Sequence, residues 1–201
     1  MVGLPSPHYA SSHPMTPADQ SIIKRVARQI REFLKTLILA LLLFFGINLA
    51  TARVRVEGSS MNPSLHDGQF VILNRLAYRW SEPERGDIIV FRFPLNPDRR
   101  FIKRVIGLPG DVISVVDGQV QVNGVPLVEP YISEPPRYSN TWTVELGKVF
   151  VLGDNRNNSS DSQAWGSLGE EQIIGKAIIV YWPLQELGFI PHYDLSVSAQ
   201  Q

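Results

Sequence analysis

A serine in an exposed loop is the first residue of the sequence that could carry chemistry. The alternating segment 54–57 ends at Gly58, two serines follow, and Pro63 stops regular structure soon after Ser60. This arrangement exposes a hydroxyl group together with the backbone N–H groups beside it. Acyl transfer needs both, the hydroxyl to attack a carbonyl carbon and the N–H groups to stabilise the oxyanion. Ser60 is therefore the predicted nucleophile.

A buried lysine could supply the base that this serine needs. An amine with a solution pKa of ~10.4 accepts a proton near neutral pH only if burial lowers that pKa by several units. Period-two alternation places Phe101, Lys103 and Val105 on one face of a predicted strand, where apolar neighbours would desolvate the amine. The alternative is that Lys103 reaches solvent from a half-exposed strand. The remaining lysines are Lys24, Lys35, Lys148 and Lys176.

Other catalytic groups have weaker support. The histidines show no metal-ligand spacing, so the sequence does not indicate a zinc hydrolase. A Ser-His-Asp triad through His66 or His192 stays open, because triad partners need only meet in space. The chain has no cysteine, which excludes a disulfide scaffold, a thiol nucleophile and a cysteine-ligated metal. We predict no cofactor and no metal.

Short β-strands must position these side chains. Segments rich in β-branched and aromatic residues recur after Arg55, and the dipeptides Asp117-Gly118 and Asn123-Gly124 between them are typical hairpin turns. We expect strands at 71–73, 88–93, 101–106, 112–116, 120–122, 142–144, 149–152 and 173–182. No convincing helix follows Arg55. The predicted fold class is mainly β, an antiparallel multi-sheet or barrel-like domain over residues 53–201.

The N-terminal quarter of the chain has a different pattern. We expect residues 1–20 to form a disordered cytoplasmic tail and residues 21–35 a basic juxtamembrane helix. Residues 36–52 carry no charge, and 17 helical residues span about 25 Å, near the lower limit for crossing a bilayer. This segment is the predicted transmembrane anchor.

Two other interpretations of the apolar segment are less favoured. A buried globular helix usually keeps one polar face, which residues 36–52 lack. A cleaved signal peptide could end at Leu49-Ala50-Thr51-Ala52, but its leader would be long. The basic residues before the span place the N-terminus in the cytoplasm and the β domain on the opposite side, although Arg53 and Arg55 weaken this asymmetry. The sequence predicts a single-pass protein of the plasma membrane or of a thylakoid-like internal membrane.

Charge is divided in the same way. The formal net charge is zero, and we predict no nucleic-acid partner, since such binding needs a clustered basic surface. Residues 1–35 carry five basic and two acidic groups, whereas residues 36–201 carry 14 and 17. The lipid bilayer is the partner that this division indicates.

Three segments together resemble the sequence boxes of type I signal peptidases, the membrane-bound Ser/Lys proteases that remove leader peptides from exported proteins. The first is Ser60-Met61-Asn62-Pro63-Ser64-Leu65, and the second is residues 101–111 around Lys103. The third is residues 153–162, continuing to Trp165-Gly166. They follow the anchor in the family's order, and the resemblance extends from about Arg53 to Tyr181.

The resemblance implies a role for each matching residue. Ser60 would attack the scissile carbonyl and become acylated, and its backbone N–H would donate to the oxyanion. Lys103 would take the serine proton and later activate the deacylating water. Ser159 would orient the lysine amine, and Met61 would help to exclude water from the site.

Two further residues would brace the site, and two positions depart from the family pattern. Arg104 and Asp161 resemble a family ion pair. Gln163 replaces an arginine often found there, which would leave Arg104 as the partner of Asp161. Gly58 stands where some members have a serine that completes the oxyanion hole, so the second donor would be backbone, water or Ser59.

The implied substrates are preproteins with small residues at the first and third positions before the cleaved bond. An extended peptide can add to a sheet edge, and a shared membrane raises its effective concentration. The alternative function is a membrane-tethered β domain that binds extended peptides without catalysis. A self-cleaving repressor would need DNA-binding helices, and the Ser-x-x-Lys match at Ser21–Lys24 lacks the companion motifs of penicillin-binding proteins.

Overall fold

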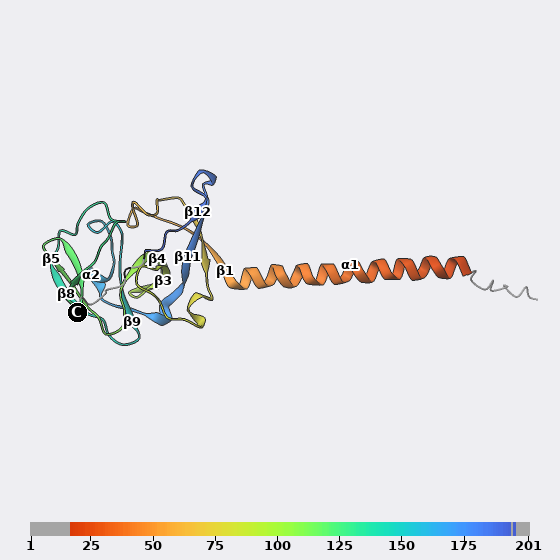
Figure 1. The fold of residues 1–201 in the computed structure, drawn as a ribbon, viewed down its shortest axis with the longest axis horizontal. Coiled ribbons are helices and arrows are strands. Elements are labelled where there is room, and N and C mark those ends of the chain that lie inside the picture. Colours follow the sequence, from red (N-terminus) through yellow and green to blue (C-terminus); the bar gives the residue numbers. More distant parts are fainter. Residues whose placement is uncertain (1–16, 194, 196–201) are drawn as a thin grey trace, which may run out of the picture. The chain divides into compact units, whose positions relative to one another are not determined.

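The computed structural model describes residues 17–193 and residue 195 (Figure 1). The chain divides into two units at Ile47 and Asn48, an N-terminal helical unit and a β-rich domain. Each unit is described by itself below. The predicted tail over residues 1–16 lies outside the described residues.

The N-terminal unit is formed by α1, Pro17–Ala50. The most apolar window of its segment Arg28–Ala50 has a mean hydropathy of 2.2, and none of that window is buried within the molecule. These 23 residues span about 35 Å, enough to cross the ~30 Å hydrocarbon core of a bilayer. The helix is therefore a candidate membrane span by length and composition.

The helix limits differ from the predicted ones at both ends. Residues 17–20, predicted to lie in the tail, belong to α1. Thr51 and Ala52, predicted to lie in the anchor, begin strand β1 (Thr51–Arg55). The helix stops there because the chain pairs with its neighbour: Thr51 lies opposite Asn74, and the Arg75 N–H donates to the Ala50 carbonyl oxygen.

The β-rich domain contains an eight-stranded antiparallel sheet. Its strand order is β1-β2-β11-β3-β4-β9-β10, and β12 pairs with β11. After β1, its strands are β2 (Phe70–Asn74), β3 (Ile88–Phe93), β4 (Asn96–Gly107), β9 (Lys148–Leu152), β10 (Leu168–Gly169), β11 (Ile173–Trp182) and β12 (Gly188–Phe189).

A second antiparallel sheet has the order β7-β6-β5-β8. These strands are β5 (Val112–Val116), β6 (Gln119–Val122), β7 (Val125–Pro126) and β8 (Asn140–Thr143). The predicted turns connect them, with positive φ at both Asp117-Gly118 and Asn123-Gly124. The short helices are η1 (Ala77–Arg79), α2 (Ser162–Trp165), η2 (Glu170–Gln172) and η3 (Leu184–Glu186). The predicted fold class is confirmed.

Strand β4 separates the apolar clusters of the domain. Val105 packs with Ile89, Phe91, Val149, Val151 and Leu168 on one side. Ile106 packs with residues of the smaller sheet, and Ile102 packs with Met61 and the residues around it. Alternation along this one strand therefore aims consecutive side chains into different parts of the interior.

Two of the unpaired strand edges in the described sheet belong to β1 and β4. β1 pairs with β2 alone, and the pairing of β4 with β9 starts only at Arg104. Residues 100–103 of β4 therefore have a partner on the β3 side alone. Four antiparallel steps separate β1 from β4 in the strand order, so the two strands with open edges run in the same direction.

The C-terminal segment packs against a glycine turn, which gives a test of the fold. Gly86 has φ +97°, and an added Cβ would overlap the carbonyl oxygen of Tyr193. Gly110 has φ +88° and open space around its Cβ position. We expect Gly110→Ala to lose about 1–2 kcal/mol from backbone strain alone, and Gly86→Ala to lose clearly more. Chemical unfolding of the full chain in detergent measures both; equal losses would contradict the packing of Tyr193 on this turn.

Candidate active site

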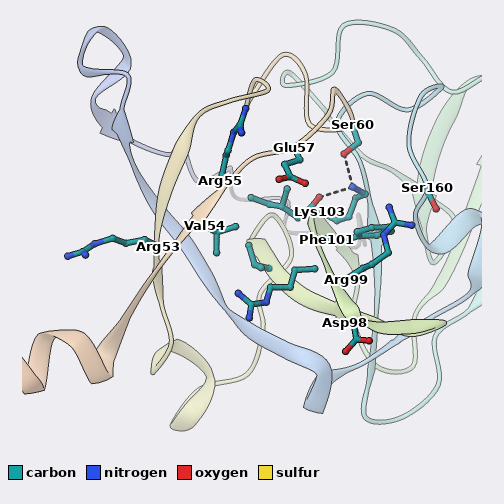
Figure 2. Close-up of a pocket in the computed structure, with 13 residues that line it drawn as sticks. Arg53, Val54, Arg55, Glu57, Ser60, Asp98, Arg99, Phe101, Lys103 and Ser160 are labelled. Carbon is teal, nitrogen blue, oxygen red and sulfur yellow. Dashed lines mark hydrogen bonds between the residues drawn. The ribbon is translucent and has the colours of Figure 1, made fainter.

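The structure brings the predicted nucleophile and base together. The Lys103 amine donates to Ser60 Oγ at 2.7 Å and to the Ile102 carbonyl oxygen at 2.8 Å (Figure 2). The two residues are 43 positions apart in the sequence. Ser60 lies in the loop after β1 and Lys103 in β4, so the sheet order of the domain creates the contact.

The Lys103 amine is buried, as the alternation of its strand predicts. Only 4% of the residue is exposed, and Nζ lies 5.4 Å from the centre of the Phe101 ring. Burial lowers the pKa of Lys103 from 10.5 to about 8, against the opposing effect of the negative charges of Asp161 and Asp154. About a tenth of the amine is therefore unprotonated at pH 7, far more than for an ordinary lysine.

Two asparagines hold the nucleophile loop from the third sequence box. The Asn155 N–H donates to the Ser60 carbonyl oxygen at 3.0 Å, and its side-chain amide donates to the Ser59 carbonyl oxygen at 3.2 Å. The Asn158 amide donates to Ser59 Oγ at 3.0 Å. Met61 anchors the loop on its other side, fully buried in the core. Sequence reasoning assigned no role to Asn155 or Asn158, although both lie in the quoted box.

A glycine allows the nucleophile loop and the third box to touch. A Cβ built on Gly153 would lie 2.5 Å from the Ser60 carbonyl oxygen and would overlap the Ser159 hydroxyl. Any side chain at this position would therefore force the Ser60 backbone and the third box apart. Gly153 therefore sets the separation between the nucleophile and the third box.

Ser159 does not form the hydrogen bond to the lysine that the family resemblance implied. Its buried hydroxyl has no well-formed hydrogen bond to any described residue. It lies near Asp161, where it favours the charged form of that carboxyl. The Lys103 amine instead uses the Ser60 hydroxyl and the Ile102 carbonyl, so the predicted Ser159–Lys103 hydrogen bond is absent from the described structure.

The predicted ion pair between Arg104 and Asp161 is wrong. Arg104 pairs with Asp154 through two hydrogen bonds, of 2.8 and 2.7 Å, and both side chains are fully buried. Asp161 accepts instead from the Gly153 N–H at 2.9 Å and caps α2 by accepting from the Gln163 N–H at 3.2 Å. Burial raises the pKa of Asp161 despite these hydrogen bonds.

The alternation of β4 explains this exchange of partners. Arg104 lies directly opposite Leu152 of β9, so Asp154, two residues further along the chain, is within reach on the same face. Lys103, the preceding residue, points to the other face of the strand. One arginine cannot serve both sides of the strand.

Arg104 connects several segments around the site through further contacts. Its guanidinium also donates to the Gly86 carbonyl oxygen at 2.9 Å and to Ser64 Oγ, in the nucleophile loop, at 3.3 Å. The Tyr131 ring centre lies 4.0 Å and the Tyr193 ring centre 5.4 Å from the same group. One side chain thus ties β4 to the nucleophile loop, the third box and the C-terminal segment.

A groove of about 640 Å³ contains the Ser60–Lys103 pair. Val54 of β1, Val90 of β3 and Ile102 of β4 give it an apolar lining. In Figure 2, Val54 projects toward the groove, while Ser60 and Lys103 lie at one end and Asp98 near the other. The groove lies between the open edges of β1 and β4 and ends at the reactive pair.

Neither candidate triad histidine belongs to this groove. The lining residues include neither His66 nor His192. His192 Nδ1 lies 3.4 Å from Asp87, and His66 is exposed. The geometry therefore favours lysine over histidine as the base beside Ser60.

Comparison with known proteins places the chain in a family. The family model described as signal peptidase, peptidase S26, matches residues 30–182. The chain is 40% identical over 191 residues to signal peptidase I of Leptolyngbya laminosa, covering 89% of this chain and 93% of the relative. It is 41% identical over 163 residues to probable signal peptidase I-2 of Synechocystis, covering 78% and 75%. It is 34% identical over 154 residues to thylakoidal processing peptidase 1 of Arabidopsis thaliana, covering 71% and 45%.

The buried Lys103 amine should lower the free energy of unfolding at pH values below its folded pKa. Because the folded pKa is lowered from 10.5 to about 8, the folded state binds fewer protons between these values, and stability rises with pH across this window. Below pH 8 the penalty is about 3 kcal/mol. Lys103→Met removes the penalty but also two hydrogen bonds of ~1 kcal/mol each. We expect a slight gain in the free energy of unfolding at pH 7 and a loss of about 2 kcal/mol near pH 10.5.

Chemical unfolding of the full chain in detergent at the two pH values provides the measurement. Lys148→Met, at a partly exposed position beside Glu145, is the control for removing one positive charge. If the two variants respond equally to pH, the Lys103 amine is not the desolvated group described above.

Proposed function

Because the chain belongs to the signal peptidase family, peptidase S26, we propose that it is a membrane-anchored endopeptidase with Ser60 as nucleophile and Lys103 as general base. Its substrates would be exported preproteins, from which it removes the N-terminal signal peptide. The observation that carries the proposal is the 2.7 Å hydrogen bond between the Lys103 amine and Ser60 Oγ in a water-poor setting.

The proposed reaction begins with a neutral Lys103. The amine takes the Ser60 proton as Oγ attacks the scissile carbonyl carbon, giving a tetrahedral oxyanion and an ammonium group. The ammonium then donates its proton to the leaving amine of the mature protein, and Ser60 holds the signal peptide as an ester. Lys103, neutral again, takes a proton from water, the resulting hydroxide attacks the ester, and the proton returns to Ser60 Oγ.

The oxyanion would be held at the turn that carries the nucleophile. The Ser60 N–H is one proposed donor. The Gly58 N–H is unsuited to this task because it donates to Asp67 Oδ1 at 2.8 Å. Ser59 Oγ accepts from Asn158, which leaves the hydroxyl proton of Ser59 available as a second donor.

An extended preprotein segment would lie in the groove between β1 and β4. Two open strand edges can supply backbone hydrogen bonds, which give affinity without selecting a sequence. Alternate residues of an extended chain share a face, so the first and third residues before the cut would point together toward the same wall of the groove. Val54 and Ile102 favour small apolar side chains there.

The helix α1 would anchor the enzyme beside its substrates. With the basic N-terminal part of α1 at the cytoplasmic side, the β-rich domain would lie on the opposite side. A preprotein held in the same membrane meets the enzyme at a raised effective concentration. Because a thylakoidal peptidase is among the relatives, the plasma membrane and the thylakoid membrane are the two proposed locations.

Cleavage of a preprotein tests the catalytic assignment. We expect the purified full chain to cut after an Ala-x-Ala site, and Ser60→Ala and Lys103→Ala to lower kcat at least a thousandfold, because each removes a reacting group. His66→Ala, at an exposed position outside the groove, should cleave as the parent does. Binding of the preprotein without Ser60-dependent cleavage would favour the non-catalytic peptide-binding domain.

The pH dependence of the rate tests the base. Only the neutral amine can take the Ser60 proton, so kcat/KM should rise tenfold per pH unit in acid and level off at an apparent pKa of about 8. The measurement uses one preprotein substrate between pH 5.5 and pH 10. A profile governed by a group near ~6.5 that disappears in His66→Ala would instead assign the base to histidine.

A further inference from the structure

Positive charge is concentrated around the groove. Arg53 and Arg55 of β1 and Arg99 and Arg100 of β4 line it, against the acidic Glu57 and Asp98. All four arginines are largely exposed. Within residues 17–193, none of the four lies within ion-pair distance of an acidic group. The groove therefore presents more positive than negative charge to any peptide that enters it.

A fifth arginine, Arg92, places two positive charges directly opposite each other in the sheet. Arg92 of β3 lies directly opposite Arg100 of β4, so the two side chains share one face of the sheet. Like charges in directly opposite positions destabilise a strand pair. Nothing in the described domain neutralises the pair, whereas an anionic group bound between the two guanidiniums would do so with charge-assisted hydrogen bonds.

The pair lies at a defined distance from the reactive serine. Arg100 precedes Lys103 by three strand residues, which corresponds to about 10 Å along β4. Arg100 and Ile102 alternate onto the same face, and both line the groove. An extended peptide with its scissile bond at Ser60 would therefore pass Arg100 some three to six residues from the cut.

The direction of the chain decides on which side of the cut these residues lie. β1 begins one residue after the candidate span and runs toward Ser60. A signal peptide held in the same membrane by its apolar segment would likewise run from that segment toward Ser60. The residues beside Arg100 are then those that precede the cleaved bond.

We propose that Arg100 and Arg92 form a subsite for an acidic side chain located about three to six residues before the cleaved bond of the preprotein. This proposal rests on the proposed signal peptidase function and adds a charge preference to it. Arg53 contributes less, because its side chain projects away from the groove in Figure 2. An anionic lipid headgroup is the less favoured occupant, since Arg100 lines the peptide groove beside Ile102.

A matched substrate series tests the subsite. The full chain, in micelles of an uncharged detergent, is given preproteins that share an Ala-x-Ala site and carry Asp, Asn or Lys at one position from three to six residues before the cut. At the best position, kcat/KM should be about threefold to fivefold higher for Asp than for Asn, and lower again for Lys. Raising the salt concentration from 50 to 500 mM should remove most of the difference.

Enzyme variants separate this subsite from a general charge effect. In Arg100→Gln the ratio of kcat/KM for Asp and Lys substrates should approach one, and in Arg100→Glu it should invert. Arg137→Gln, at an exposed position that pairs with Glu134 and does not line the groove, should keep the parental ratio. Equal cleavage of the three substrates, or a preference that survives in Arg100→Gln, would overturn the proposal.

Two further outcomes are distinguishable. If the Asn substrate is cut in a Ser60-dependent manner without any charge preference, the subsite fails and the proposed function stands. If no substrate is cut, or Ser60→Ala cuts equally well, the proposed function fails. If cleavage in lipid vesicles depends on the fraction of anionic lipid through Arg100 and not on substrate charge, a headgroup is the occupant and the subsite proposal is wrong.

Discussion

The burial of one amine is the constraint on which the rest of the site depends. Lys103 can take a proton from Ser60 near neutral pH only if water is kept from it, because solvation stabilises the ammonium form. The strand must therefore turn a lysine inward between Phe101 and Val105, and the loop with Ser60 must close over it. This arrangement lowers the free energy of unfolding at neutral pH. The packing of the surrounding elements must therefore keep the Lys103 side chain buried, since the charged amine would be more stable in solvent.

Arg104, the next residue of the same strand, is also buried but must keep its positive charge. Arg104 is fully buried and cannot lose its charge, so it needs a carboxylate partner, which Asp154 supplies in a bidentate pair. Such a pair adds little net stability, but its geometry is demanding, and it links β4 to the third box. Consecutive residues of β4 thus hold a readily neutralised cation on one face and a permanent cation on the other. The second fixes the backbone that positions the first.

Local patterns in the sequence predicted some of this arrangement and missed the rest for a physical reason. The inward face of Lys103 follows from alternation within six residues, and the position of Ser60 in a loop follows from a glycine and a proline close by. The partner of Arg104 depends on the register between β4 and β9, which is irregular between Val105 and Gly107. No local pattern contains that register. The roles of Asn155 and Asn158 require the third box to fold onto a loop almost 100 residues away.

The strand β1, one border of the groove, follows the candidate membrane span directly in the chain. β1 starts one residue after that span and leads within ten residues to Ser60, so in the proposed function a short segment of chain would join the anchor to the nucleophile. Backbone pairing with two strand edges can bind many sequences, and a shared membrane reduces the affinity that each of them needs. Selectivity can then come from small contributions, an apolar wall that admits short side chains and a few charges along the approach. Because each contribution is weak, none would prevent an enzyme of this design from processing many different preproteins.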